Sequence, residues 1–135
     1  MTEPLRALVT GVASGIGRSM AKALRDRGDQ VFGVDHQSGA GWLQADLSVP
    51  AERTKAVQSA LAELGGIDVL VNVAGIYRPT PFATSTLQEW RDVWAVNLEA
   101  PLELMALVFP HMRDQGFGRV VNITSVHAKF SRQDA

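Results

Sequence analysis

The chain has 135 residues, of which 46% are hydrophobic and 20% charged, and its formal net charge is −1. This composition is typical of one globular domain and argues against an intrinsically disordered chain. The two signs of charge are interspersed without a basic stripe, which argues against a nucleic-acid partner. The absence of cysteine excludes disulfides and thiolate metal sites.

The N-terminal stretch MTEPLRALVTG carries only a short apolar run before Gly11, unlike a secretory signal peptide. No apolar run along the chain has the length that crossing a bilayer requires. The three histidines are too scattered to form a metal site. We therefore expect a cytoplasmic protein without a membrane partner and without a metal.

The first third of the chain predicts a strand, a helix and two further strands. RALVTG (6–11) is an apolar strand that ends in glycine. In residues 14–28 apolar side chains recur at helical spacing, and Gly28 suits the C-terminal cap. Strands are predicted next at 30–35 and 42–47.

The middle of the chain continues this alternation. Residues 49–64 predict a helix with Pro50 in its first turn and two glycines after its end. The near-continuous apolar run of 67–75 predicts a strand that is buried on both faces, as in a parallel sheet.

A long helical pattern spans 86–115, and we expect it to break near 97–101. Trp90 and Trp94 lie four residues apart on this helix, a spacing that favours packing in the core or at an interface. GRVVNITS (118–125) then predicts a fifth buried strand.

This alternation indicates an α/β fold, a doubly wound and mostly parallel sheet of the Rossmann type. Strands and helices that alternate in this way form right-handed crossovers, with helices on both faces of the sheet. Such folds bind their ligands at the carboxyl ends of the strands.

A glycine-rich loop, TGVASGIG (10–17), lies where the first strand turns into the first helix. Gly11 permits a tight turn, Gly15 permits close backbone approach, and Gly17 lets the helix pack against the sheet. The helix N-terminus then offers unpaired N–H groups to a pyrophosphate, and Ser14 can add a hydroxyl donor. A glycine-rich turn without a ligand is the alternative.

Asp35 ends the second strand, 24 residues after Gly11. A carboxylate there can accept hydrogen bonds from an adenosine ribose and repels a 2′-phosphate. Positions 14 and 36 hold serine and histidine, so neither provides a lysine or arginine that would attract such a phosphate. The pattern favours NAD over NADP; the alternative is that Asp35 is a solvated turn residue.

The spacing of the three glycines resembles the TGxxxGxG signature of the short-chain dehydrogenase/reductase family. Further motifs match in the family's order: ADL (45–47), NVAG (72–75), VNL (96–98) and VNITS (121–125). The resemblance implies a dinucleotide-binding Rossmann-type domain over residues 1–135, the N-terminal portion of a single-domain oxidoreductase. It also implies a secondary alcohol or ketone as the substrate and a homo-oligomer, either dimer or tetramer.

The resemblance further implies where the cofactor binds. Asp46 would bond the adenine amino group, with Leu47 beside the ring, and the segment from Asn72 to Gly75 would lie against the adenosine side. Val73 departs from the family's usual second asparagine. The full cofactor-binding set is Gly11, Ser14, Gly15, Ile16, Gly17, Asp35, Asp46, Leu47, Asn72, Ala74 and Gly75.

Two residues resemble the family's catalytic groups. Asn97 matches the asparagine whose backbone anchors a water in a proton relay, and Ser125 matches the serine that holds the substrate's oxygen. A helix-break residue and a strand-end hydroxyl are the respective structural alternatives.

The family's general acid/base is a tyrosine in a YxxxK motif shortly after the serine. Tyr77 is the one tyrosine of this chain, and Lys129 has no tyrosine four residues before it. We therefore expect that the polypeptide is incomplete after the fifth strand, and that the 135 residues alone do not turn over substrate.

The short loop 36–41 and the later AGIYRP segment are similar to the family's dehydrogenases that oxidise 2,3-dihydro-2,3-dihydroxybenzoate, a cyclic dihydrodiol. Tyr77, Arg78, His127 and Phe130 could line a substrate cleft or be ordinary loop residues. A non-catalytic dinucleotide-binding or regulatory module remains an alternative function. A Rossmann-type methyltransferase would explain only the first glycine loop.

Overall fold

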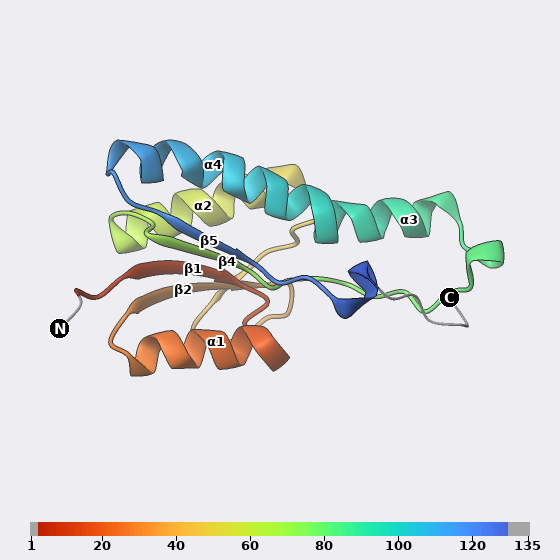
Figure 1. Ribbon diagram of the computed structural model, residues 1–135, viewed down its shortest axis with the longest axis horizontal. Helices are drawn as coiled ribbons and strands as arrows, with labels where there is room; N and C mark the ends of the chain where they lie inside the picture. The colour runs from red at the N-terminus through yellow and green to blue at the C-terminus, as the bar shows by residue number, and fades with distance from the viewer. Residues whose placement is uncertain (1–2, 130–135) are drawn as a thin grey trace.

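The computed structural model describes residues 3–129. A five-stranded sheet forms its centre (Figure 1), with all four strand pairs parallel and the order β3-β2-β1-β4-β5. The order runs outward from β1 on one side and resumes with β4 on the other, so the switch point lies between β1 and β4. The strands are β1 (Arg6–Thr10), β2 (Gln30–Asp35), β3 (Leu43–Gln44), β4 (Val69–Asn72) and β5 (Arg119–Asn122).

Helices cover both faces of this sheet, α1 on one face and α2 with α4 on the other (Figure 1). Pro50 stands in the first turn of α2, and Gly65 ends that helix with φ +75°. Thr86 and Glu89 form a reciprocal capping box at the start of α3. The helices are α1 (Gly15–Asp26), α2 (Pro50–Leu64), α3 (Leu87–Trp94) and α4 (Ala100–Asp114), with short turns η1 (Phe82–Thr84), η2 (Ala95–Glu99) and η3 (Val126–Ala128).

Two apolar layers result from the alternation of side chains along the strands. Leu8 and Leu70 face α2 and α4, where Leu104 and Val108 of α4 are fully buried. Ala7 and Val9 face α1 on the opposite side. The doubly wound α/β fold predicted from the sequence is therefore confirmed.

Two strands are shorter than predicted because hydroxyl and carboxylate groups capture their backbone. The strand expected at 67–75 ends at Asn72, where the Thr10 hydroxyl accepts the N–H groups of Val73 (3.1 Å) and Ala74 (3.0 Å). The strand expected at 42–47 keeps only Leu43–Gln44, since the Asp46 N–H donates to the Glu52 carboxylate at 2.6 Å and the chain turns there.

The fifth strand is exposed, so the prediction of a buried strand is wrong. Val120 is 41% and Val121 39% exposed, and β5 pairs only with β4 among residues 3–129. It also ends at Asn122, three residues before Ser125. Apolar composition predicts a strand, but it does not reveal whether a further element covers that strand.

The helix expected to break near 97–101 instead continues through a π-helical turn, η2. Pro101 has no N–H, so the carbonyl of Asn97 lacks its donor at the ordinary i+4 position. The N–H of Ala100 bonds the carbonyl of Ala95, five residues back. The helical stretch Leu87–Asp114 has a mean hydropathy of 1.3 over its most apolar window; by length and composition it could cross a bilayer, a test that core helices of soluble proteins also pass.

The two tryptophans of α3 lie at the surface rather than in the core. Trp90 is 36% and Trp94 50% exposed, and their ring centroids lie 6.2 Å apart. The core alternative for this pair is therefore wrong, because α3 buries no residue among those described. In Figure 1 α3 extends beyond the end of the sheet.

Candidate functional site

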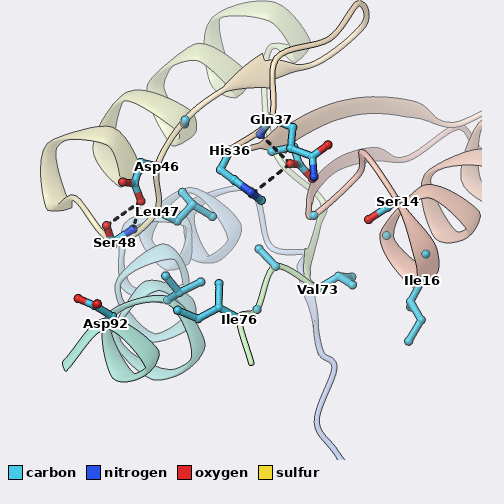
Figure 2. A pocket seen from close by; sticks show the side chains of 18 of the residues that line it. Ser14, Ile16, His36, Gln37, Asp46, Leu47, Ser48, Val73, Ile76 and Asp92 are labelled. Atoms are coloured by element: carbon cyan, nitrogen blue, oxygen red, sulfur yellow. Dashed lines mark hydrogen bonds and ion pairs between the residues drawn. The ribbon is translucent and has the colours of Figure 1, made fainter. Parts of the chain in front are cut away.

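A cavity of about 580 Å³ lies at the carboxyl ends of β1, β2 and β4 (Figure 2). It is the position at which parallel α/β sheets bind ligands. The glycine loop, the end of β2 and the loops after β3 and β4 contribute most of its lining. The lining residues are Gly11, Ser14, Gly15, Ile16, Gly17, Asp35, His36, Gln37, Ala45, Asp46, Leu47, Ser48, Val73, Ala74, Gly75, Ile76, Arg78, Asp92 and Val96.

The glycines of the loop differ in what surrounds them. A Cβ on Gly17 would lie 2.0 Å from the Gly11 carbonyl oxygen, and one on Gly11 would lie 2.9 Å from the Ala74 nitrogen. A Cβ on Gly15, at φ +53°, would have nothing within 4 Å. Packing thus requires two of the glycines, whereas Gly15 keeps space open beside the cavity.

The N-terminus of α1 faces the same space with its N–H groups uncapped by a side chain. Ser14 stands at the N-cap in extended conformation, and its hydroxyl makes no capping hydrogen bond. The first N–H groups of a helix need acceptors from elsewhere and favour an anion. This loop therefore suits a phosphate or pyrophosphate.

Asp35 is held in one orientation at the end of β2. It is 6% exposed, and its carboxylate accepts the N–H of Ala13 and the N–H of Gln37, each at 2.9 Å. His36 Nδ1 lies 3.3 Å from Asp35 Oδ1. The carboxylate is thus positioned by the backbone on both sides and lines the cavity.

Asp46 and Leu47 form the side of the cavity opposite the glycine loop (Figure 2). The hydroxyl and N–H of Ser48 donate to Asp46 Oδ1 at 2.7 and 2.9 Å, and these bonds hold the pKa of Asp46 below its usual value. Leu47 is 5% exposed and offers an apolar wall.

Arg53 supports the wall formed by Leu47 from behind, a role that was not predicted from the sequence. It is 2% exposed, and its Nε donates to the Leu47 carbonyl at 2.6 Å. Nη1 donates to Glu103 of α4 at 2.6 Å, and Nη2 to the carbonyl of Ala95 at 3.0 Å. One guanidinium thus ties the loop after β3 to η2 and α4. Its helical spacing with the buried Ala56 and Val57 was the signal in the sequence.

The segment after β4 reaches the cavity only in part. Ala74 and Gly75 line it, whereas Asn72 does not. The Asn72 amide instead donates to Asn122 Oδ1 of β5 at 2.8 Å, and its own Oδ1 is buried without a partner in the described part of the chain. Asn72 therefore links two strands and does not contact the cavity.

Asn97 lies beside a second cavity of about 170 Å³, which shares Ile76 and Arg78 with the first. Its amide donates to the Ile76 carbonyl at 2.8 Å and accepts the Ile76 N–H at 2.7 Å. This reciprocal pair fixes the loop after β4 against η2.

Ser125 lines neither cavity. Its hydroxyl accepts the N–H of His127 at 3.2 Å and caps η3 at the surface. Of the four residues considered for a substrate cleft, Arg78 lines both cavities and Tyr77 the smaller one, His127 is exposed, and Phe130 lies outside the described residues.

Residues 3–129 contain no group of three or more histidine, aspartate or glutamate side chains arranged to hold a metal ion. The cavity instead combines an anion-binding loop, a fixed carboxylate and an apolar wall. This arrangement can hold a phosphorylated nucleoside.

Comparison with known proteins agrees with the family resemblance seen in the sequence. A profile of short chain dehydrogenases matches residues 6–134. The short-chain reductase protein NovJ of Streptomyces niveus is 38% identical over 138 residues, which cover 91% of this chain and 53% of that protein. An acetoacetyl-CoA reductase of Paracoccus denitrificans is 36% identical, over 91% of this chain and 55% of its own.

Solved structures are similar over nearly the whole chain. A short-chain dehydrogenase from Streptomyces avermitilis superposes with a TM-score of 0.88 at 30% identity, covering 96% of this chain and 52% of that one. Aldohexose dehydrogenase from Thermoplasma acidophilum gives 0.90 at 28% identity, over 98% and 54%. The chain spans about half the length of the curated relatives it matches. It belongs to the short-chain dehydrogenase family.

Proposed function

We propose that the protein is an NAD-dependent oxidoreductase that transfers a hydride between nicotinamide and a secondary alcohol or ketone. The observation that carries this proposal is the cavity in which an uncapped helix N-terminus and the fixed carboxylate of Asp35 lie together. The relatives named reductases and the similar structures named dehydrogenases support the reaction class. A cyclic dihydrodiol substrate, a homo-oligomeric assembly and a cytoplasmic location are part of the same proposal.

The residues of the cavity fit an adenine dinucleotide. The glycine loop and Ser14 would hold the pyrophosphate, Asp35 the ribose hydroxyls, and Asp46 with Leu47 the adenine. A 2′-phosphate would meet the Asp35 carboxylate, so we expect NAD to bind more tightly than NADP.

The bound nicotinamide supplies the hydride acceptor or donor. Ser125 would donate a hydrogen bond to the substrate's oxygen, and such a donor stabilises the charge that develops there. Asn97, whose side chain is already occupied by Ile76, would act through its backbone carbonyl, which Pro101 leaves without an i+4 donor.

The test is calorimetric titration of the protein with NAD and with NADP. We expect NAD to bind and Gly15→Val to abolish binding, because the branched side chain would enter the open space beside the cavity. Gly41→Val is the matched control: Gly41 also has a positive φ (+93°) and open space around its Cβ position, but it does not line the cavity. Unchanged NAD affinity in folded Gly15→Val would contradict the phosphate-binding role.

A non-catalytic dinucleotide-binding module is the second candidate. The observation that favours it is that the residues proposed to hold the adenosine line the larger cavity, whereas Ser125 lines neither cavity. The 135 residues alone are expected not to turn over substrate, so the full-length product of the gene is incubated with NAD and a panel of secondary alcohols, and the absorbance of NADH is followed. Reduction of NAD would support the oxidoreductase, and NAD binding without any reduction by that full-length product would support the module.

A further inference from the structure

His36 follows Asp35 and lies at the rim of the cavity. Its side chain is 72% exposed, and its ring lines the space assigned to the adenosine. Nδ1 lies 3.3 Å from Asp35 Oδ1, and the Gln44 amide donates to the His36 carbonyl at 3.1 Å. The backbone on both sides of the imidazole is therefore held, while the ring remains open to solvent and ligand.

Two carboxylates from different elements act on this imidazole. Asp35 ends β2 and lies in contact with it, and Asp46 lies in the connection after β3 with its carboxylate bonded to Ser48 (Figure 2). Ser48 makes the largest contribution to the low pKa of Asp46, and the charge of His36 lowers it further, with a smaller contribution from Arg53. The guanidinium of Arg18 on α1 is engaged with the Ala13 carbonyl, and that of Arg53 with the Leu47 carbonyl.

This geometry places the imidazole of a histidine 3.3 Å from a buried carboxylate. Histidine side chains change charge between about pH 5 and 8. With neutral His36, Asp35 presents an uncompensated negative charge to any anion in the cavity. With protonated His36, the pair has no net charge, and the exposed ring offers a cationic N–H donor.

We propose that His36 makes the cofactor preference of this site depend on pH, admitting the 2′-phosphate of NADP when protonated and leaving Asp35 to exclude it when neutral. The proposal rests on the proposed function, because it assumes that the adenosine ribose lies beside Asp35. NAD carries no 2′-phosphate, so its affinity should change little over the same range.

The experiment is calorimetric titration with NAD and with NADP at pH 5.5 and pH 8.0. For the wild-type protein we expect the ratio of Kd for NADP to Kd for NAD to fall by about tenfold on acidification, a size typical of one gained charge contact at a surface. A 2′-phosphate also loses charge near pH 6, so the result is the difference between the wild type and His36→Gln. In His36→Gln we expect the ratio to fall less than threefold.

His111→Gln is the matched control, since His111 is an exposed histidine of α4 that does not line the cavity. It should behave as the wild type. Equal pH dependence in the wild type and His36→Gln, with NAD bound throughout, would overturn the role of His36 and leave the proposed function standing. Failure of NAD to bind at both pH values would overturn both.

Discussion

The two ends of the proposed site are built in different ways. At the proposed adenosine end, Asp35 and Leu47 are buried, and the backbone or a buried guanidinium fixes each of them. At the other end, Asn97 and Ser125 are exposed; Asn97 bonds the backbone of Ile76, and Ser125 accepts the N–H of His127. A buried polar group is costly unless it is paired, so the first end is tied to the stability of the fold. The second end can change without unfolding the protein.

The largest effect that would test this difference is expected from Arg53→Met. Removing the guanidinium leaves the Glu103 carboxylate and the Leu47 carbonyl without this donor, while the Ala95 carbonyl keeps the N–H of Ala100. Arg53 is buried but Glu103 is 35% exposed, so losing the buried guanidinium and its hydrogen bonds should lower the free energy of unfolding by about 3 kcal/mol, the low end of the range for buried pairs. Urea denaturation measures it.

Arg113→Met on α4 is the control, because Arg113 and its partner Asp114 are both more than half exposed. Exposed pairs contribute about 0–1 kcal/mol. If Arg53→Met lowered the free energy of unfolding by less than 1 kcal/mol, the Arg53 guanidinium would not stabilise the proposed adenosine end.

A second comparison uses two glycines of one loop. Gly17→Ala places a Cβ against the Gly11 carbonyl and should cost about 2–3 kcal/mol, since the backbone must move. Gly15→Ala has free space and should cost only about 1 kcal/mol from its left-handed φ. Thermal and urea unfolding of both variants provide the check, and a larger loss for Gly15→Ala would contradict the packing argument.

The N-terminal ends of β1 and β4 form a region that is remote from both ends of the proposed site. Arg6 donates to Asp68 at 2.7 and 2.8 Å, and this lowers the pKa of Asp68. A lowered folded-state pKa stabilises the protein above the unfolded value near 4 and less as the pH falls below it. Asp68→Asn should therefore cost about 1.5 kcal/mol at pH 7 and less at pH 3.

In the folded Asp68→Asn variant, NAD affinity should stay within about twofold, because Asp68 does not line the cavity. Urea denaturation at both pH values and one NAD titration suffice. A cost that grows on acidification would show that the sign of this linkage is wrong.

The smallest effect is expected from Ser125→Ala. An exposed hydroxyl that caps one short turn should change the free energy of unfolding by less than about 0.5 kcal/mol. NAD affinity should also be unchanged, since the residue is assigned to the substrate's oxygen. Loss of NAD binding in this variant would place Ser125 at the cofactor instead.

The adenosine end was more predictable from the sequence than the other end. The spacing of Gly11, Gly15 and Gly17 is itself the motif that predicts the loop. Asp35 lies at the end of a strand that can be recognised from its apolar residues. Local pattern is sufficient here because the loop, strand and helix that form this end are contiguous or neighbouring in the sheet.

The remaining features depend on contacts between distant segments. Arg53 meets Glu103 and Ala95, which lie 50 and 42 residues away, so its partners cannot be read from α2 alone. The π turn escaped prediction because i+5 bonding barely alters the apolar period, and Pro101 suggested a break instead. The exposure of β5 depends on what lies beside it, which its own residues do not encode.

The π turn also limits how the length of the chain can vary. A π turn accommodates one residue more than an α-helix would over the same stretch. Deleting one residue between Ala95 and Glu99 would leave α3 and α4 at nearly the same rotation, but Pro101 would then lie inside a regular α-helix, where its ring clashes with the carbonyl four residues back. Inserting one more residue would rotate α4 relative to α3 by about 100° and turn Leu104 out of the core. Substitutions in this stretch should therefore be tolerated more readily than single-residue insertions or deletions.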